Sequence, residues 1–256
     1  MDLLEHKNNT ASIRHPWETA RLEVIQSLLQ RESILLEATT IADIGCGDTF
    51  VVNSLANKYP NKKYIAIDSA FTDEDIEYFS SGTNNNISLY NNIDAIDKEQ
   101  SIDIILLMDV IEHIELDVDF LKSLIDNTGL TEKSRILITV PAFNSLFSAH
   151  DKYLKHFRRY NTRELKRTAE EAGYSVQSSG YFFSSLLTVR VFERLAEVLF
   201  GKKDQKGLNE KQYNEKTAKV IKTFLLLDFG ISKIFNKIGI SIPGLSTYII
   251  CTKSAQ

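Results

Sequence analysis

The chain has 256 residues, of which 43% are hydrophobic and 25% are charged, and its formal net charge is -4. These values are typical of a globular protein, and the acidic balance disfavours a surface devoted to nucleic acid. The two cysteines, Cys46 and Cys251, are too few for a disulfide framework, and no basic leader precedes an apolar run, so we expect a cytoplasmic protein.

Strand-like and helix-like patterns alternate along most of the chain, after an amphipathic helix predicted near residues 16–29. The predicted strands are residues 41–45, 63–68, 87–90, 102–108, 135–140, 174–183 and 247–252. The predicted helices between the strands are residues 51–58, 72–81, 116–127 and 161–172. For the last of these helices, Asn161 with Glu164 three residues later predicts a capping box, and Gly173 predicts its end.

This alternation predicts an α/β fold, a doubly wound and mostly parallel sheet of seven strands with helices on both faces. We expect a single domain over residues 1–256. Its expected parts are a helical cap at 1–40, a cofactor-binding core at 41–184, a helical insertion at 185–245 and a last strand within 246–256. Two helices are predicted in the insertion, separated by a polar, lysine-rich linker at residues 202–214. Ligands of such sheets bind beyond the carboxyl ends of the strands.

The sequence Asp43-Ile44-Gly45-Cys46-Gly47 stands between the first predicted strand and a helix, where glycines allow close backbone approach to a ligand. Phe50 occupies the position of the third glycine of a dinucleotide fingerprint, and no phosphate-binding Gly-Lys-Ser/Thr follows. Asp68 ends the second strand, where a carboxylate accepts both hydroxyls of a ribose. A ribose without a diphosphate fits S-adenosylmethionine better than NAD.

This arrangement resembles the class I S-adenosylmethionine-dependent methyltransferases, over roughly residues 15–185 and again at the last strand. The resemblance implies a Rossmann-like methyltransferase fold whose last strand is antiparallel to its neighbours. It also implies that Asp43 and the glycines face the methionine part of the cofactor and that Asp68 holds the ribose. The full set of cofactor-binding residues that it implies is Asp43, Gly45, Cys46, Gly47, Asp68, Asn92, Ile93, Asp94, Met108 and Asp109. The family often continues with Thr-Gly where this chain has Asp48-Thr49-Phe50.

Acidic residues and histidines follow the fourth predicted strand. Asp109, Glu112 and His113 are spaced so that one helical turn would point them to the same side. This segment resembles ubiquinone-pathway O-methyltransferases and also RNA 3′-terminal 2′-O-methyltransferases, in which a related segment and a later histidine hold a divalent metal. The second resemblance implies Mg²⁺, Mn²⁺ or Zn²⁺ on Asp109, Glu112, His113 and His156. Without a metal, His113 or His156 is the candidate general base for a substrate hydroxyl.

The segment of residues 148–160 resembles bacterial methyltransferases of envelope and lipid pathways. We therefore expect O-methylation of a small molecule, a glycan or a lipid-linked acceptor. RNA methylation and a non-catalytic binding module are the alternatives, and the acidic net charge counts against RNA. The basic residues nearby form a local positive cluster that suits either an anionic substrate or a solvated helix face, and the solvated face is the preferred interpretation after Asn161. The members of this cluster are Lys152, Lys155, Arg158, Arg159, Arg163, Lys166 and Arg167. The apolar stretch 181–200 suits an acceptor pocket, a peripheral membrane contact or a homodimer interface. We therefore expect either a monomer or a homodimer.

Overall fold

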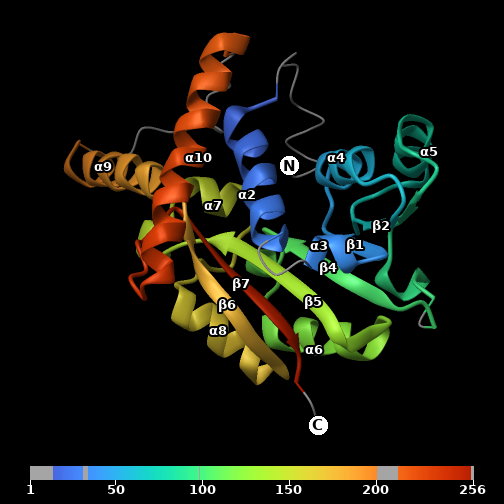
Figure 1. Ribbon diagram of the computed structural model, residues 1–256. Coiled ribbons are helices and arrows are strands. Elements are labelled where there is room, and N and C mark those ends of the chain that lie inside the picture. Colours follow the sequence, from blue (N-terminus) through green and yellow to red (C-terminus); the bar gives the residue numbers. More distant parts are fainter. Residues whose placement is uncertain (1–13, 31–33, 98, 201–212, 255–256) are drawn as a thin grey trace.

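A single seven-stranded sheet runs through the computed structural model, which describes residues 14–30, 34–97, 99–200 and 213–254 (Figure 1). The strands are β1 (Thr40–Ile44), β2 (Lys63–Ile67), β3 (Ile87–Tyr90), β4 (Ile102–Met108), β5 (Leu130–Pro141), β6 (Tyr174–Phe182) and β7 (Ser246–Lys253). Their order is β3-β2-β1-β4-β5-β7-β6. Strands β1 to β5 are parallel, and β7 is antiparallel to both β5 and β6. The predicted α/β fold with an antiparallel last strand is therefore confirmed.

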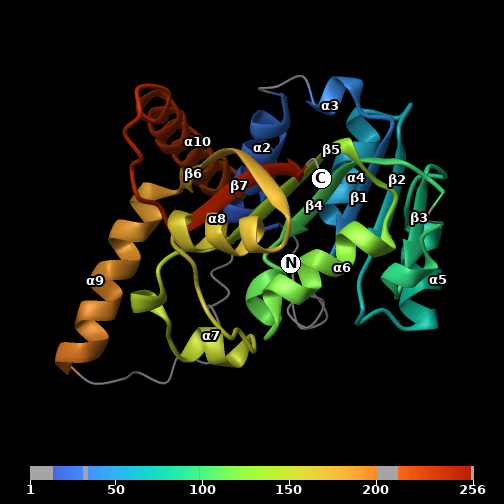
Figure 2. The same cartoon turned by 90° about the horizontal axis from the view of Figure 1, so that it is seen from below.

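Helices cover both faces of the sheet and enclose two hydrophobic cores (Figures 1 and 2). The helices that pack over the first core are α2 (Pro16–Gln30), α3 (Ile34–Glu37), α4 (Phe50–Lys58), α5 (Asp73–Gly82) and α10 (Glu215–Lys237). The opposite face carries α6 (Asp117–Asn127) and α8 (Thr162–Glu171). A short helix, α7 (Ala149–Tyr153), lies in the long connection between β5 and α8. Because helices pack on both faces of the sheet, β1 is buried along its whole length and β4 is buried at every residue but one.

The predicted element bounds agree closely with the structure in the core. Strands β3 and β4 have the predicted ends, and α8 begins after Asn161 with the predicted capping box. The prediction for β5 was wrong at its start, because the strand begins at Leu130 rather than at residue 135. The residues after the buried Leu130, at positions 131–133, are exposed and polar, and the Ser134 hydroxyl donates to the Ile102 carbonyl oxygen at 2.6 Å beside a register shift. This irregularity removes the apolar pattern that would have revealed the strand.

The chain between β6 and β7 forms the predicted helical pair, α9 (Ser184–Phe200) and α10. Helix α10 lies against α2, where the Lys222 ammonium is 3.2 Å from a Glu23 carboxylate oxygen. Helix α9 projects away from the body of the molecule in both ribbon views (Figures 1 and 2). Most of the predicted linker at 202–214 lies outside the described residues. Among the residues described, no helix combines the length and the apolar character that crossing a bilayer requires.

Candidate active site

The loop after β1 lies at the carboxyl edge of the sheet, and Gly45 is required there for steric reasons. Its φ is +74°, and a Cβ atom built on it would lie 2.5 Å from Cγ2 of Val110, which comes from the loop after β4. The same loop is held to the neighbouring strand, since the Gly45 and Cys46 amides both donate to the Ile67 carbonyl oxygen. The glycine thus lets two ligand-facing loops touch.

Asp43 is fully buried in β1, and neither of its carboxylate oxygens has a hydrogen-bond partner among the described residues. Burial raises the pKa of this carboxyl group to about 7. An orphaned acceptor of this kind is costly in a folded protein unless a ligand supplies a donor. A positively charged ligand group, such as the amino group of a methionine moiety, fits that requirement.

Asp68 follows β2 and faces the β1–α4 loop. One carboxylate oxygen, Oδ2, accepts the Gly47 amide at 2.8 Å, and the other accepts the Ala70 amide at 3.0 Å. Each oxygen keeps a further lone pair, so the carboxylate has room to accept hydroxyl donors as well. The structure therefore brings Gly47 and Asp68 together, as a ribose-binding carboxylate beside the glycine loop requires.

The loop after β3 supplies the third predicted part of the site. Asn92 begins a short 3₁₀ turn, η1 (Ile93–Ala95), and its side-chain oxygen accepts the Asp94 amide at 3.0 Å. Asn92 and Asp94 are exposed, whereas Ile93 is half-buried and packs on the second core. The loop therefore presents one apolar side chain flanked by two polar ones at the same edge of the sheet.

Two arginines close the site from the N-terminal side, and the sequence pattern did not predict a role for either. The first, Arg14, forms ion pairs with Glu18, at 2.8 Å, and with Asp48. Its guanidinium also stacks 3.9 Å from the ring centroid of Phe50. The pairing partners lie up to 34 residues away in the sequence, so no local spacing reveals them. Phe50, which departs from the family pattern, thus serves as a platform for Arg14.

Asp109 does not share a helical turn with the residues that follow, so that prediction was wrong. It adopts a φ of +56°, and the 3₁₀ turn η2 (Ile111–His113) begins only after Val110. The Asp109 carboxylate instead lies 2.5 Å from the guanidinium of the second arginine, Arg21 of α2, which also donates to the Thr139 hydroxyl at 3.2 Å. A left-handed backbone on a residue other than glycine is strained and is most often found at functional sites.

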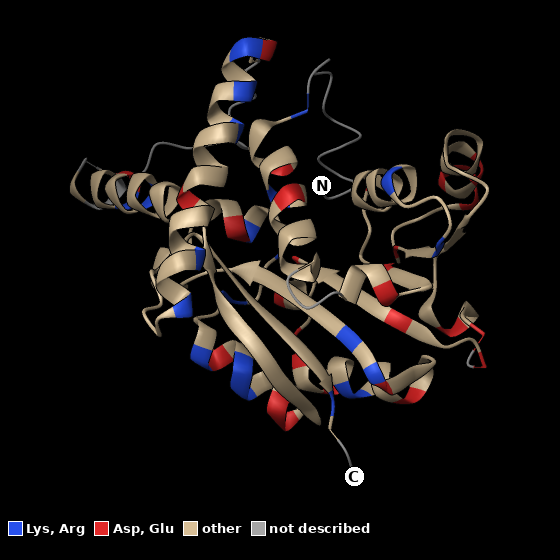
Figure 3. Ribbon diagram, viewed as in Figure 1, with Lys and Arg blue, Asp and Glu red and all other residues tan. Residues whose placement is uncertain are grey.

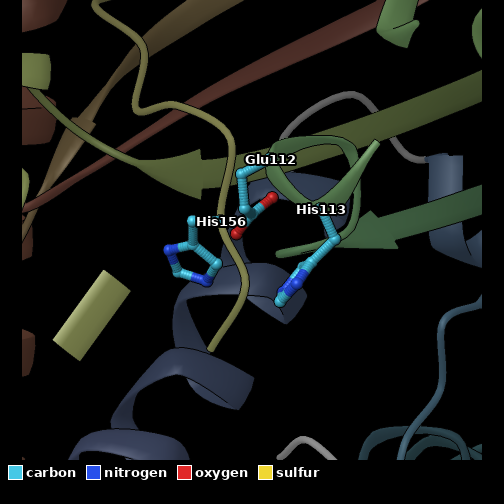
Figure 4. A group of neighbouring side chains, drawn as sticks. All are labelled: Glu112, His113 and His156. Carbon is cyan, nitrogen blue, oxygen red and sulfur yellow. The ribbon is translucent and has the colours of Figure 1, made fainter. Parts of the chain in front are cut away.

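Three of the four residues considered as metal ligands do converge. One ligand atom from each of Glu112, His113 and His156 lies within 4.8 Å of the others, and the two imidazole rings meet edge to face at 4.5 Å (Figure 4). Glu112 is fully buried, and both its oxygens lack a hydrogen-bond partner among the described residues. Burial, reinforced by the Asp109 carboxylate, raises the pKa of Glu112 well above its usual value. A cation or proton donor placed in this cluster would relieve that cost.

Asp151, which the sequence pattern did not single out, orients His156. Its Oδ1 is 3.0 Å from Nδ1 of His156 and 2.6 Å from Nε of Arg159, while the Ser148 amide donates to Oδ2 at 2.8 Å. Burial would raise the pKa of Asp151, but the hydrogen bonds from His156 and Arg159 hold it well below its ordinary value. An ionised Asp151 keeps the proton of His156 on Nδ1, which leaves the lone pair on Nε2.

The predicted basic cluster is only partly available to a substrate. Arg159 is bound to Asp151, and Arg158 pairs with Asp117 at 2.9 Å and donates to the Glu115 carbonyl oxygen. Both arginines therefore brace the loop that carries His156. The remaining basic residues of the cluster lie on or near α7 and α8, along the outside of the molecule (Figure 3).

The comparisons with known proteins agree with this geometry. A family model described as a methyltransferase domain matches residues 17–179, which is more than half of the chain. Coclaurine N-methyltransferase bound to N-methylheliamine and S-adenosylhomocysteine is 15% identical, with a TM-score of 0.56 over 92% of this chain and 73% of that one. The plantazolicin methyltransferase BamL, also solved with S-adenosylhomocysteine, is 17% identical, with a TM-score of 0.55 over 92% and 85%.

A third solved structure, described as a putative sarcosine dimethylglycine methyltransferase from Galdieria sulphuraria, is 15% identical. Its TM-score is 0.55 over 92% of this chain and 85% of that one. At these identities the likeness shows the fold, whereas the family match also covers the residues of the candidate site other than Arg14. A search of curated proteins gives no significant match to this sequence.

Proposed function

The chain belongs to the class I S-adenosylmethionine-dependent methyltransferases, and from that premise we propose that it methylates a hydroxyl oxygen of a small molecule, glycan or lipid-linked acceptor. The observation that carries the proposal is the ionised Asp151 beside His156, which prepares Nε2 of a buried imidazole to take a proton. An amine acceptor can lose its proton without such help, but a hydroxyl is much less acidic and gains from a general base.

We assign the cofactor to the edge formed by the loops after β1, β2, β3 and β4. The unpartnered Asp43 carboxylate would meet the positive amino group of the methionine moiety, and Asp68 would accept the ribose hydroxyls. Ile93, between Asn92 and Asp94, would supply the apolar contact for the adenine. Cys46, Met108 and Asp109, which lie at the ends of β1 and β4 or just beyond them, would line the same edge.

When bound, S-adenosylmethionine supplies an electrophilic methyl group on a sulfonium. The protein's residues would place the acceptor oxygen in line with that methyl carbon and exclude water. Nε2 of His156 would take the hydroxyl proton as the acceptor oxygen gains the methyl group and the sulfonium is released as the neutral thioether. Asp151 stabilises the resulting imidazolium, and His113, whose ring touches that of His156, is the second candidate for the base.

The cluster of Glu112, His113 and His156 supports a second candidate, a divalent metal that binds the acceptor hydroxyl. One carboxylate and two imidazoles suit Zn²⁺ or Mn²⁺, and the Asp151–His156 contact has the form of a carboxylate that orients a metal-bound histidine. Asp109 is left out of this ligand set because Arg21 holds it. A metal in this position would lower the pKa of the acceptor hydroxyl.

Calorimetric titration with S-adenosylmethionine tests the cofactor assignment. We expect the wild-type protein to bind and Asp68→Ala to lose at least about tenfold in affinity, because a good hydrogen bond to a charged group contributes about 1.5–3 kcal/mol. Asp126→Ala is the matched control, since Asp126 is exposed near the end of α6, at the opposite edge of the sheet. Equal binding by all three proteins would contradict the assignment of Asp68.

Transfer of labelled methyl groups to hydroxyl and amine acceptors tests the chemistry. We expect His156→Gln to reduce transfer to hydroxyls by about 10²–10⁴-fold while cofactor binding is retained. The same assay with chelator and with added Mn²⁺ or Zn²⁺ separates the two candidates, since only the metal-dependent reaction stops with chelator. Transfer to hydroxyls that is unaffected by His156→Gln, or transfer to amines alone by the wild type, would exclude hydroxyl methylation through this base.

A further inference from the structure

Helix α10 carries two apolar faces, and only one of them is buried. Leu225 and Phe229 face the first core and are 1% and 5% exposed. The opposite face presents a second row at spacings of four and three residues, and each member is 55–68% exposed. The members of this row are Val220, Phe224, Leu227, Ile231, Ile234 and Ile238. An exposed apolar row of this kind favours association with a second surface, because it is costly to leave in water.

Helix α9 also presents exposed apolar side chains. They belong to Val189, Val191, Phe192, Leu195 and Leu199. Of the 18 large hydrophobic side chains that are exposed among the described residues, 13 lie between residues 189 and 240. The exposed apolar area is therefore concentrated on this helical pair rather than scattered over the molecule. We call these residues of α9 and α10 the apolar helical surface.

The charge of the helical pair differs in sign from that of the whole chain. Helices α9 and α10 together contain seven Lys and Arg against four Asp and Glu, a net charge of +3 in a chain whose net charge is -4. Figure 3 shows lysines at both ends of α10. Lys216, Lys219 and Lys237 are exposed, whereas Lys222 and Lys233 are bound to α2 through Glu23 and Ser27.

We propose that the apolar helical surface docks the protein onto an anionic lipid bilayer, with α9 and α10 lying in the interface. Exposed Phe, Leu and Ile side chains on helices of positive net charge are the features that peripheral helices use for this purpose. No described helix is suited to crossing the bilayer, so the contact is with one leaflet. The proposal goes beyond the methyl transfer and does not depend on the identity of the acceptor.

A second copy of the chain is the competing occupant, since spacings of four and three residues also suit helix pairing. Two observations favour lipid over a second copy. Pairing of α10 with α10 would leave the exposed residues of α9 uncovered. It would also bring two segments of like charge together, whereas an anionic surface attracts both.

Vesicle co-sedimentation of the full chain tests the proposal. The probes are vesicles of phosphatidylcholine alone and of phosphatidylcholine with about one-third phosphatidylglycerol, where each basic residue near the surface adds about 1 kcal/mol. The test variant is the triple substitution Phe224→Gln, Leu227→Gln and Ile231→Gln, because glutamine preserves the helix. The matched control is Leu36→Gln, Tyr78→Gln and Leu116→Gln, three exposed apolar residues on other elements. Circular dichroism and cofactor titration report whether each variant is folded.

We expect the wild type and the control to bind anionic vesicles at least about tenfold more tightly than the test variant, and to release them at high salt. Absence of vesicle binding by the folded wild type would overturn the proposal, as would equal binding by the test variant. Sedimentation velocity without vesicles gives the last outcome. If the wild type does not bind vesicles but forms a dimer, and the test variant is a monomer, the surface would be assigned to contact with a second copy instead.

Discussion

At the scale of single residues, the candidate site is marked by buried carboxylates that the folded chain leaves unpaired. Asp43 and Glu112 each have two side-chain oxygens without a partner among the described residues, and the pKa of each is raised by burial. Neither buried carboxyl group stabilises the protein without a ligand, because an unpaired buried polar group carries its full desolvation cost. Their presence is the expected signature of a site kept ready for a positively charged group or a proton donor.

Asp43→Asn should therefore stabilise the ligand-free protein while it weakens cofactor binding. The folded-state pKa of about 7 lies above the unfolded value of about 3.9, so the stability of the wild type falls as the pH rises through that interval. We expect the variant to gain roughly 1–3 kcal/mol over the wild type at pH 8 and almost nothing at pH 4. Denaturant titration at both pH values, with calorimetric titration of the cofactor, measures the two effects.

Asp103→Asn is the control, because its expected change in the free energy of unfolding has the opposite sign to that of Asp43→Asn. Burial would raise the pKa of Asp103, but hydrogen bonds from the Thr39 and Thr40 amides lower it. This variant should lose stability above the unfolded pKa, and the loss should fade as the pH falls below it. If the free energy of unfolding of Asp43→Asn changed with pH in the same way as that of the wild type, the carboxyl group would not be held protonated.

At the scale of elements, the turn from β1 into α4 depends on one glycine and its neighbour across the site. Gly45→Ala combines a left-handed backbone with a Cβ atom 2.5 Å from Cγ2 of Val110, so the loops after β1 and β4 would be forced apart. We expect a loss of about 2–4 kcal/mol in the free energy of unfolding and a matching loss of cofactor affinity.

Gly230→Ala is the control for that substitution, measured by the same thermal and denaturant unfolding. Gly230 lies within α10, and a Cβ atom added to it would have nothing within 4 Å. Alanine there should stabilise the helix by up to about 1 kcal/mol. If Gly45→Ala behaved like Gly230→Ala, the contact between the two loops would not be tight.

At the scale of the whole molecule, α10 links the insertion to the N-terminal helix that covers the site. Two phenylalanines of α10 distinguish its packing on the core from its proposed docking surface, since Phe229 is 5% exposed and Phe224 is 57% exposed. Phe229→Ala should cost about 3–5 kcal/mol in the free energy of unfolding, because it leaves a cavity against α2 and the sheet.

Phe224→Ala should change that free energy by less than about 0.5 kcal/mol, since no buried contact is lost. Thermal unfolding of both variants without lipid checks the pair of expectations. A large loss for Phe224→Ala would mean that its face of α10 is already covered, for example by a second copy.

Local patterns along the chain predict the fold, which the structure confirms, and they also predict the proposed cofactor edge. Alternating apolar patterns, the capping box at Asn161 and the glycines beside Asp43 are local signals, and local spacing sets the strands, the helices and their order. The pairing of Asp68 with Gly47 followed from parallel strands whose carboxyl ends meet at one edge.

The assembly of the rest of the candidate site depends on contacts between residues that are far apart in the sequence, so it could not be predicted from local spacing. Arg21 meets Asp109 and Arg14 meets Asp48 across long stretches of sequence, and the left-handed backbone of Asp109 removes it from the histidine cluster. The bond between Asp151 and His156 and the exposed row on α10 likewise depend on three-dimensional packing. Spacing along a chain reports which face of an element is apolar, but only packing determines which face is covered and which charges meet.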